Sequence, residues 1–249
     1  MDHLTLVEPP VQYVRRRDGT RLAYRHLHGE GPTLLFLPGY MSDMQGGKAQ
    51  ALAAWAECHN RAMLRLDYSG CGESDGKFES GTLDIWRDDV CAVIAAVVTG
   101  PIIIIGSSMG GWLMLLVAQA LGDQVRALVG IAAAPDFTDW DFDAADKATL
   151  LEKGRIERPS DYGYDPMVVT HAFWQSGQDN LQLTGAIAIN CPVRLIHGQQ
   201  DPDVPWDISV QLAAQLRSAE VQTILIKDGD HRLSRDQDIA LLIDVVAKL

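Results

Sequence analysis

Apolar runs alternate with amphipathic stretches along most of the chain, from residue 33 onward. The apolar runs predict strands, which lie at 33–37, 61–68, 102–106, 125–134, 193–197 and 221–227. The amphipathic stretches predict helices, which lie at 48–60, 82–98, 112–121, 207–217 and 236–249. Strands that are apolar on both faces need helices on both faces. The pattern therefore predicts an α/β fold built on a mostly parallel sheet.

The residues before this alternation predict a hairpin. The segments "QYVRRR" (12–17) and "RLAYRHLH" (21–28) flank Asp18-Gly19, a pair typical of a tight turn between antiparallel strands. These two strands bring the predicted sheet to eight strands. The hairpin also carries the basic cluster of the chain, the arginine triplet 15–17, which we expect to be solvated.

The alternation stops between residues 136 and 190. This stretch of roughly 55 residues is too long for a simple loop in a compact domain. We interpret it as a helical lid, 136–190, inserted into a single domain that spans residues 1–249. Some of its aromatic residues are expected to form a core for the lid and others to face the functional site. These residues include Trp140, Phe142, Tyr162, Tyr164, Phe173 and Trp174.

The charge and hydropathy of the chain exclude several classes of partner. The formal net charge is −12 at pH 7 and the pI is near 4.9. An acidic chain of this kind repels phosphate backbones, so we expect no nucleic-acid partner. No apolar stretch reaches the roughly 18–20 residues that a transmembrane helix needs, so we expect no membrane span.

The cysteines and the first residues favour a reducing compartment. The cysteines at 58, 71, 91 and 191 form no CxxC pair, so neither zinc ligation nor a disulfide scaffold is expected. The opening MDHLTLVEPP has neither the pattern of a signal peptide nor the Arg- and Ser-rich character of a transit peptide. We therefore expect a cytoplasmic protein with reduced thiols.

The stretch "IIIIGSSMGGW" (102–112) joins an apolar strand to a helix through small residues. Residues 106–110 read G-x-S-x-G, which between a strand and a helix is the pattern of a nucleophile elbow. The turn strains the serine backbone and raises its hydroxyl above the carboxyl edge of the sheet. The positions two before and two after must be small, because larger side chains would collide with the turn. Ser108 is therefore the candidate nucleophile, and Ser107 is expected to be a packing residue.

A serine hydroxyl needs a base to activate it, and the base needs an acid to orient it. In a fold of this kind the acid and then the histidine follow the serine along the chain. His231 lies in the loop "IKDGDHRL" after the last predicted strand and is the candidate base. His197, at the end of the preceding strand, is the alternative, and we expect it to be packed behind the site.

The loop "HGQQDPDVPW" follows the strand 193–197 and offers two carboxylates. Asp201 is favoured as the orienting acid, and Asp203 is the first alternative. Asp136 is a lesser alternative, because it also follows a strand whose end lies near the switch region of the sheet. Asp67 precedes the nucleophile and is expected to hold the turn "YSGCGES".

Two backbone N–H groups are expected to complete the site as an oxyanion hole. One belongs to Met109, at the start of the helix behind the serine, and the other to Tyr40, in the loop after the strand 33–37. Gly39 allows that loop to approach the substrate oxygen. The side chains of Tyr40, Met41 and Met109 are predicted to line an acyl pocket. Chemistry of this kind needs no metal and no cofactor.

Several longer segments carry a resemblance to a known family: "LPGYMSDMQGGKA", "LDYSGCGESDG", "GSSMGGWLML", "NCPVRLIHGQQDPDVPW" and "GDHR". They resemble the α/β-hydrolase superfamily. Within it they are most similar to the abhydrolase-domain palmitoyl-protein thioesterases of animal mitochondria and to their bacterial relatives. The resemblance covers roughly residues 20–135 and 188–249, and it implies a catalytic triad of Ser108, Asp201 and His231.

The resemblance implies a serine hydrolase that cleaves acyl thioesters or carboxylic esters, acting on a small molecule or an acylated protein. Members of the family remove acyl groups from cysteine thioesters, and some cleave acyl-glucuronide esters. Residues 136–190 match the family poorly, and the lid largely sets acyl specificity in this fold. Two other hypotheses stay open, because a fold does not fix a function. One is another reaction of the fold, by a peptidase, a carbon–carbon hydrolase or a cofactor-free haloperoxidase, and the other is a non-catalytic binding protein.

Overall fold

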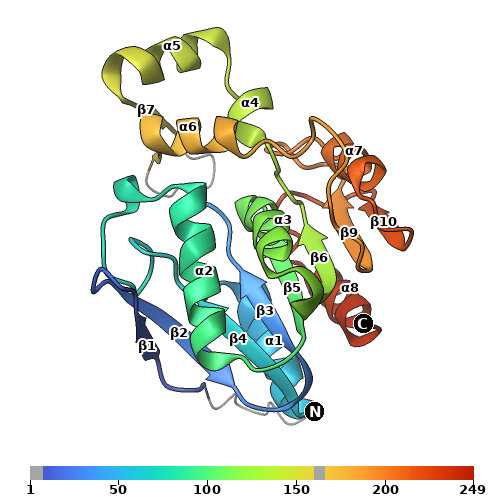
Figure 1. Cartoon of the computed structure of the whole chain (residues 1–249). Helices are drawn as coiled ribbons and strands as arrows, with labels where there is room; N and C mark the ends of the chain where they lie inside the picture. Colours follow the sequence, from blue (N-terminus) through green and yellow to red (C-terminus); the bar gives the residue numbers. More distant parts are fainter. Residues whose placement is uncertain (1–7, 160–165) are drawn as a thin grey trace.

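An eight-stranded sheet forms the centre of the structure, a computed structural model that describes residues 8–159 and 166–249 (Figure 1). The strands lie in the order β1-β2-β4-β3-β5-β6-β9-β10. Their bounds are β1 Gln12–Arg15, β2 Arg21–Leu27, β3 Glu30–Leu37, β4 Arg61–Leu66, β5 Ile102–Ser107, β6 Val125–Ile131, β9 Val193–Gly198 and β10 Val221–Ile226. β2 pairs antiparallel with β1 and β4, and the other neighbours pair parallel. The predicted hairpin and the mostly parallel eight-stranded sheet are confirmed.

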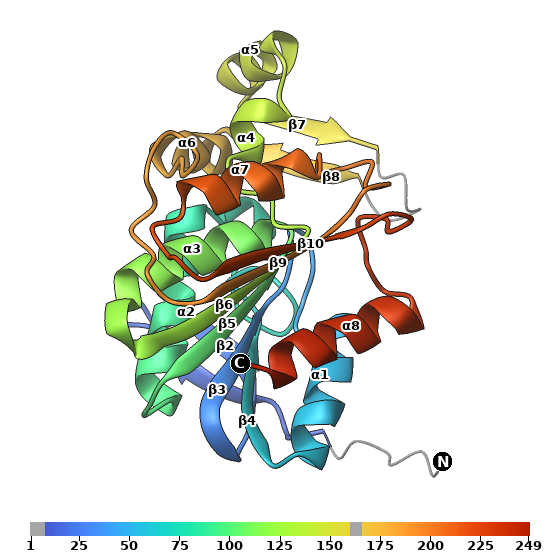
Figure 2. The same ribbon diagram turned by 90° about the vertical axis from the view of Figure 1, so that its right-hand side faces the viewer.

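The isoleucines of β5 show how the sheet divides the core into two layers. Successive side chains of a strand point to opposite faces. Ile102 and Ile104 pack with α2, α3 and α7, whereas Ile103 and Ile105 pack with α1 and α8 on the other face (Figure 2). The helices are α1 Gly47–Cys58, α2 Leu83–Val97, α3 Met109–Leu121, α7 Asp207–Gln215 and α8 Asp236–Ala247, with short 3-10 turns η1 Phe78–Ser80 and η2 Gly122–Gln124. The predicted helices on both faces are thus confirmed.

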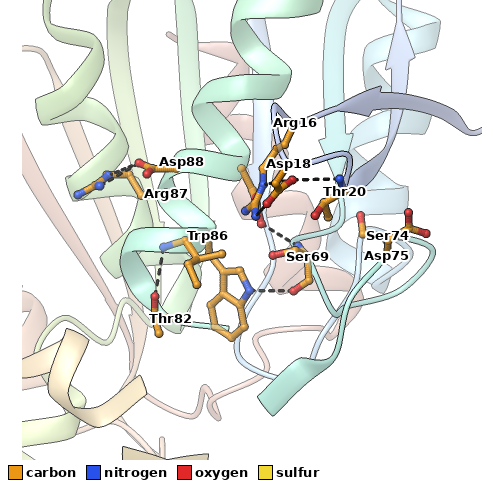
Figure 3. A network of polar contacts seen from close by, with 12 residues as sticks. Arg16, Asp18, Thr20, Ser69, Ser74, Asp75, Thr82, Trp86, Arg87 and Asp88 are labelled. Atoms are coloured by element: carbon orange, nitrogen blue, oxygen red, sulfur yellow. Dashed lines mark hydrogen bonds and ion pairs between the residues drawn. The ribbon is translucent and has the colours of Figure 1, made fainter. Parts of the chain in front are cut away.

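The basic triplet of the hairpin is not simply solvated. The guanidinium of Arg16 donates a hydrogen bond to the carboxylate of Asp89 on α2, with 2.7 Å between the atoms, and the Asp89 side chain is 0% exposed. The other Asp89 oxygen accepts the backbone N–H of Ser69 at 2.8 Å, and the Trp86 indole donates to the Ser69 carbonyl at 3.0 Å (Figure 3). A buried carboxylate needs such partners. The expectation of a solvated cluster is therefore wrong for Arg16.

The described residues of this insertion, 136–159 and 166–190, lie above the carboxyl edge of the sheet (Figure 1). They contain α4 Phe137–Trp140, α5 Ala144–Lys153, β7 Arg155–Arg158, β8 Met167–Thr170 and α6 His171–Asp179. The lid is not helical throughout, because β7 and β8 form a two-stranded antiparallel sheet. Each of these strands has four residues, which is too short to leave a clear alternating pattern in the sequence. Tyr162 and Tyr164 lie outside the described residues.

Aromatic side chains of the lid point inward and pack both with one another and with the core beneath the lid. Phe142 and Phe173 are 3% and 1% exposed, and Phe137, which the sequence analysis did not single out, lies between them. The Trp140 indole donates a hydrogen bond to the carbonyl of Pro135, and the Trp174 indole donates one to the carbonyl of Thr138. The expectation of a core that belongs to the lid alone is therefore wrong, because Phe173 also packs on Trp86 and Phe137 on Trp112 in the core beneath the lid.

The structure also bears on the expectations about membrane spans and cysteines. Within residues 8–159 and 166–249, no helix has the length and apolar character needed to cross a membrane. In the structure Cys58, Cys71, Cys91 and Cys191 are free thiols. Most of the opening segment on which the reading of the N-terminus rests, residues 1–7, lies outside the described residues.

Candidate active site

Ser108 occupies a sharp turn between β5 and α3. Its backbone has φ 55° and ψ −122°, a conformation that costs free energy for any residue with a side chain. The glycines on either side are required sterically. A Cβ added to Gly106 would lie 2.3 Å from the carbonyl oxygen of Gly110, and one added to Gly110 would lie 2.2 Å from that of Leu37. The small residues of the elbow are thus explained by backbone contacts around the serine.

Three loops at the carboxyl edge of the sheet bring Ser108, His231 and Asp201 into one hydrogen-bonded chain. The Oγ of Ser108 is 3.2 Å from Nε2 of His231, and Nδ1 of His231 is 2.8 Å from Oδ2 of Asp201. Ser108 follows β5, Asp201 follows β9, and His231 follows β10. With a proton on Nδ1, the imidazole donates to the carboxylate and accepts from the serine hydroxyl. This is the arrangement in which a histidine can take the proton of a serine.

The carboxylate of Asp201 is buried and held on both oxygens. Its side chain is 0% exposed, and Oδ1 accepts the backbone N–H groups of Asp203 and Val204 at 2.9 Å and 2.8 Å. Oδ2 also lies 3.2 Å from Nε2 of His197. Burial alone would raise the pKa of Asp201, but the hydrogen bonds from His197, His231 and Val204 outweigh it. The pKa of Asp201 lies well below its usual range, so this carboxylate is an anion at neutral pH.

The alternative acids have other contacts in the structure. Asp136 has φ 61°, and its carboxylate accepts the backbone N–H groups of Gln182 and Leu183 at 2.8 Å and 2.7 Å, which joins the two roots of the lid. Asp67 accepts the backbone N–H groups of Met44 and Glu73, so the expectation that it holds its turn is confirmed.

Asp203 lies close to the candidate triad. One ligand atom from each of Asp201, Asp203 and His231 falls within 4.8 Å of the others, the kind of grouping that can hold a cation. Two of these three residues already face each other through a hydrogen bond. Clustered acidic groups are common without a bound ion. The hydrogen bonds from Asp201 to His231 and from His231 to Ser108 already explain why these side chains lie together.

The two predicted oxyanion donors flank the serine. Met109 is the first residue of α3, so its N–H has no acceptor within the helix. The loop that carries Tyr40 lies against the serine, since a Cβ on Gly39 would be 3.3 Å from the Cβ of Ser108. Among the described residues, neither of these two N–H groups has a hydrogen-bond acceptor.

The three predicted pocket residues differ in their surroundings. The Met109 side chain is 1% exposed and belongs to the large hydrophobic core, whereas a pocket-lining side chain was predicted. Met41 has φ 55° and is 42% exposed. The Tyr40 hydroxyl donates to the carbonyl of Val168 in the lid at 2.7 Å, and its ring centroid lies 4.7 Å from that of Phe173. Tyr40 therefore connects the oxyanion loop to the lid, and burial raises its pKa far above the usual value.

Two residues near the site make contacts that the sequence analysis did not predict. His197, expected to be packed behind the site, touches Asp201 directly. Lys48, near the start of α1, donates a hydrogen bond to the carbonyl of Arg232, the residue after His231. The "IHG" segment next to the acid loop is a weak signal for the first contact. No signal exists for the second, because residues 48 and 232 are far apart in the chain.

The chain belongs to the alpha/beta hydrolase family, whose model matches residues 34–245. Human "Palmitoyl-protein thioesterase ABHD10, mitochondrial" is 39% identical over 247 residues, which cover 96% of this chain and 81% of that protein. The solved structure of alpha/beta hydrolase domain-containing protein 10 from mouse has a TM-score of 0.90 and 38% identity, covering 96% of this chain and 97% of that one. A putative hydrolase from Agrobacterium vitis S4 has a TM-score of 0.89 and 34% identity, covering 96% and 98%.

These similarities confirm the predicted fold and the predicted class of enzyme, a serine hydrolase of the thioesterase or esterase type. They contradict the expected location. The human, Pongo abelii and mouse relatives are all named as mitochondrial proteins, which points to mitochondria rather than to the cytoplasm. Composition and cysteine usage do not distinguish these compartments, because both are compatible with free thiols.

Proposed function

We propose that this enzyme removes acyl groups from thioesters and carboxylic esters through Ser108, His231 and Asp201. The observation that carries the proposal is the hydrogen-bonded chain of these three side chains, which begins at a serine held with φ 55°. His231 takes the proton of the Ser108 hydroxyl as its oxygen attacks the acyl carbonyl, and Asp201 stabilises the imidazolium that forms. The N–H groups of Tyr40 and Met109 stabilise the oxyanion.

The second half of the reaction uses the same groups. His231 returns the proton to the leaving thiol or alcohol, which departs and leaves the acyl group on Ser108. A water molecule then attacks the acyl carbonyl while His231 accepts its proton; the bond between Ser108 Oγ and the acyl carbon breaks, His231 returns the proton to Oγ, and the carboxylic acid leaves. In each half of the reaction one proton passes from the attacking group to His231 and from there to the departing group, so the steps as proposed use no metal ion and no cofactor.

The substrate class follows from the lid and from the charge of the chain. The described part of the lid covers the site in this proposal, and the partly exposed rings of Trp140 and Trp174, together with Tyr40 and Met41, provide an apolar surface for an acyl chain. Each buried methylene contributes roughly 0.8 kcal/mol. The net charge of −12 disfavours polyanionic partners, including nucleic acid and intact coenzyme A. An acylated protein or a small acyl thioester is the preferred substrate, in keeping with relatives named palmitoyl-protein thioesterases.

A chain-length series tests this proposal. Acyl groups from C2 to C16 are presented on one thiol leaving group and again on one phenol, and kcat/KM is measured. We expect kcat/KM to rise with acyl length over the short-to-medium range. A flat profile, or a preference for amides, would contradict an acyl pocket. Labelling with a fluorophosphonate, lost in Ser108→Ala, distinguishes this reaction from ligand binding without catalysis.

A further inference from the structure

The carboxylate of Asp201 lies between two imidazoles, and the proposed reaction uses only one of them. His231 Nδ1 is 2.8 Å from Oδ2 of Asp201, and His197 Nε2 is 3.2 Å from the same oxygen. His197 lies near the end of β9 and is 0% exposed. A buried imidazole needs a hydrogen-bond partner for each of its nitrogens.

The partners of His197 determine where its proton lies. Nε2 is 3.2 Å from the Asp201 carboxylate and 3.0 Å from the carbonyl oxygen of Val204, and both of these groups only accept hydrogen bonds. Nε2 must therefore carry a proton. Nδ1 lies 2.7 Å from the hydroxyl of Ser209 on α7, a residue that is 1% exposed and can donate its proton to the ring. A hydrogen-bonded chain thus runs from Ser209 through His197 to Asp201.

We propose that His197 is a positioning residue for the acid of the triad, a role that rests on the proposed function of Ser108, His231 and Asp201. Its Nε2–H group holds Oδ2 of Asp201 where the Nδ1–H of His231 meets it. Ser209 sets the angle of the His197 ring from α7. The acid loop is thereby fixed from β9 on one side and from α7 on the other, independently of the backbone N–H groups that hold Oδ1.

Two substitutions separate this role from simple packing. In His197→Gln the side-chain amide nitrogen falls near the position of Nε2, so a donor to Asp201 is kept. In His197→Asn the amide reaches only the position of Nδ1, so that donor is lost. We expect His197→Asn to lower kcat for a thioester about 10- to 100-fold, as for loss of a hydrogen bond to a charged group, with KM within about twofold. We expect His197→Gln to keep kcat within about fivefold of the unchanged enzyme.

A spectroscopic measurement tests the same role without activity. Histidine labelled with ¹⁵N in the full chain reports which ring nitrogen is protonated, and the resonances of His197 are assigned by through-bond correlation of its ring to its backbone. We expect a protonated Nε2 and, in Ser209→Ala, a shift of the His197 Nδ1 signal. This measurement applies to the unchanged protein even where a His197 variant does not fold.

The results separate the two proposals. If Ser108→Ala keeps its activity, the proposed function fails whatever His197 does. If Ser108→Ala is inactive while His197→Asn and His197→Gln have equal kcat at equal folded fraction, the role of His197 alone is refuted. An Nε2 without a proton in the ¹⁵N spectrum would refute it as well.

Discussion

The elbow around Ser108 and the lid above it are built in different ways. At the elbow the decisive contacts involve the backbone, such as the carbonyl of Leu37 that would lie 2.2 Å from a Cβ on Gly110. In the lid the decisive contacts are between side chains, such as Phe137 with Phe173 and Tyr40 with Phe173. A backbone contact prescribes one residue type, whereas an aromatic cluster accepts several packing solutions.

This difference separates what the reaction requires from what selects the substrate. The elbow and the loops after β9 and β10 hold Ser108, His231 and Asp201 within hydrogen-bond reach of one another, which general-base catalysis needs. The lid is joined to the oxyanion loop by the hydrogen bond from the Tyr40 hydroxyl to the carbonyl of Val168. Changes at the sheet edge should therefore abolish the chemistry, and changes at the lid should alter the choice of acyl group.

The largest effect is expected at the nucleophile. Ser108→Ala should lower kcat/KM by at least about 10³-fold, because no hydroxyl remains to attack the carbonyl. Ser107→Ala is the matched control, one residue away, and should keep most of the activity. Steady-state kinetics on a short thioester measures both. An inactive Ser107→Ala beside an active Ser108→Ala would show that the elbow has a different register.

The acid comes next. Asp201→Asn should lower kcat by about 10²- to 10⁴-fold, because the amide no longer stabilises the imidazolium of His231. Asp203→Asn is the control within the same loop, since its backbone N–H still supports Asp201. Asp136→Asn tests the lid root and should reduce stability more than rate. Equal losses of kcat in Asp201→Asn and Asp203→Asn would contradict the assignment of the acid.

A pair of glycines compares the elbow with the segment that leaves the lid. Gly110→Ala should destabilise the fold by about 1–3 kcal/mol, because its Cβ would overlap backbone atoms that cannot move aside. Gly185→Ala has nothing within 4 Å of the added Cβ and should change stability by about 0.5 kcal/mol or less. Urea unfolding gives both free energies. Similar values for the two variants would remove the steric explanation of the elbow.

The contact between the oxyanion loop and the lid can be cut without touching the backbone. Tyr40→Phe removes the hydrogen bond to Val168 and should cost about 1 kcal/mol of stability. It should also change the dependence of kcat/KM on acyl length, because the lid is then held less firmly. Tyr24→Phe is the control, since the Tyr24 hydroxyl donates to Gln12 at 2.9 Å, far from the lid. If kcat/KM depends on acyl length in the same way in Tyr40→Phe, the Tyr40 hydroxyl has no part in selecting the acyl group.

The residues that the sequence identified share one physical property. Ser108, Asp201 and His231 were identified because each follows a predicted strand at the same edge of the sheet, a constraint that is local in the chain. Gly106 and Gly110 were explained by the space available at a turn. Each of these features could be evaluated within about ten residues of the chain.

The features that could not be predicted from the sequence depend on contacts between distant segments. The buried Asp89 fixes Arg16, which lies 73 positions earlier in the chain, so the triplet 15–17 looked like a solvated cluster. Met109 offered an apolar side chain next to the nucleophile, but the start of α3 turns it into the core. The strands β7 and β8 are too short to produce a pattern, and their pairing is decided by the lid as a whole.

The smallest effect is expected at Lys48, which supports the loop of His231 from α1. Burial and then the nearby charge of Arg232 lower the pKa of Lys48 to about 8, and Asp230 and Asp238 partly oppose this shift. Because the folded pKa lies below that of the unfolded chain, the unfolded state binds more protons between pH 8 and 10.5. Stability from this group is therefore lowest below pH 8 and rises as the pH increases through that window.

Lys48→Met isolates this contribution. Solvent screens the partly buried amine, so the effect is small. Between pH 7.5 and pH 10.5 the free energy of unfolding of the unchanged protein, relative to that of Lys48→Met, should increase by less than about 1 kcal/mol. Urea unfolding at the two pH values measures the difference, with Lys248→Met, whose amine pairs with Asp244 on the surface of α8, as the control. The control difference should not change with pH in the same direction. If the difference in free energy of unfolding between the unchanged protein and Lys48→Met stays constant or falls as the pH rises, the Lys48 amine is as well solvated as that of Lys248. Lys48 would then not stabilise the loop of His231.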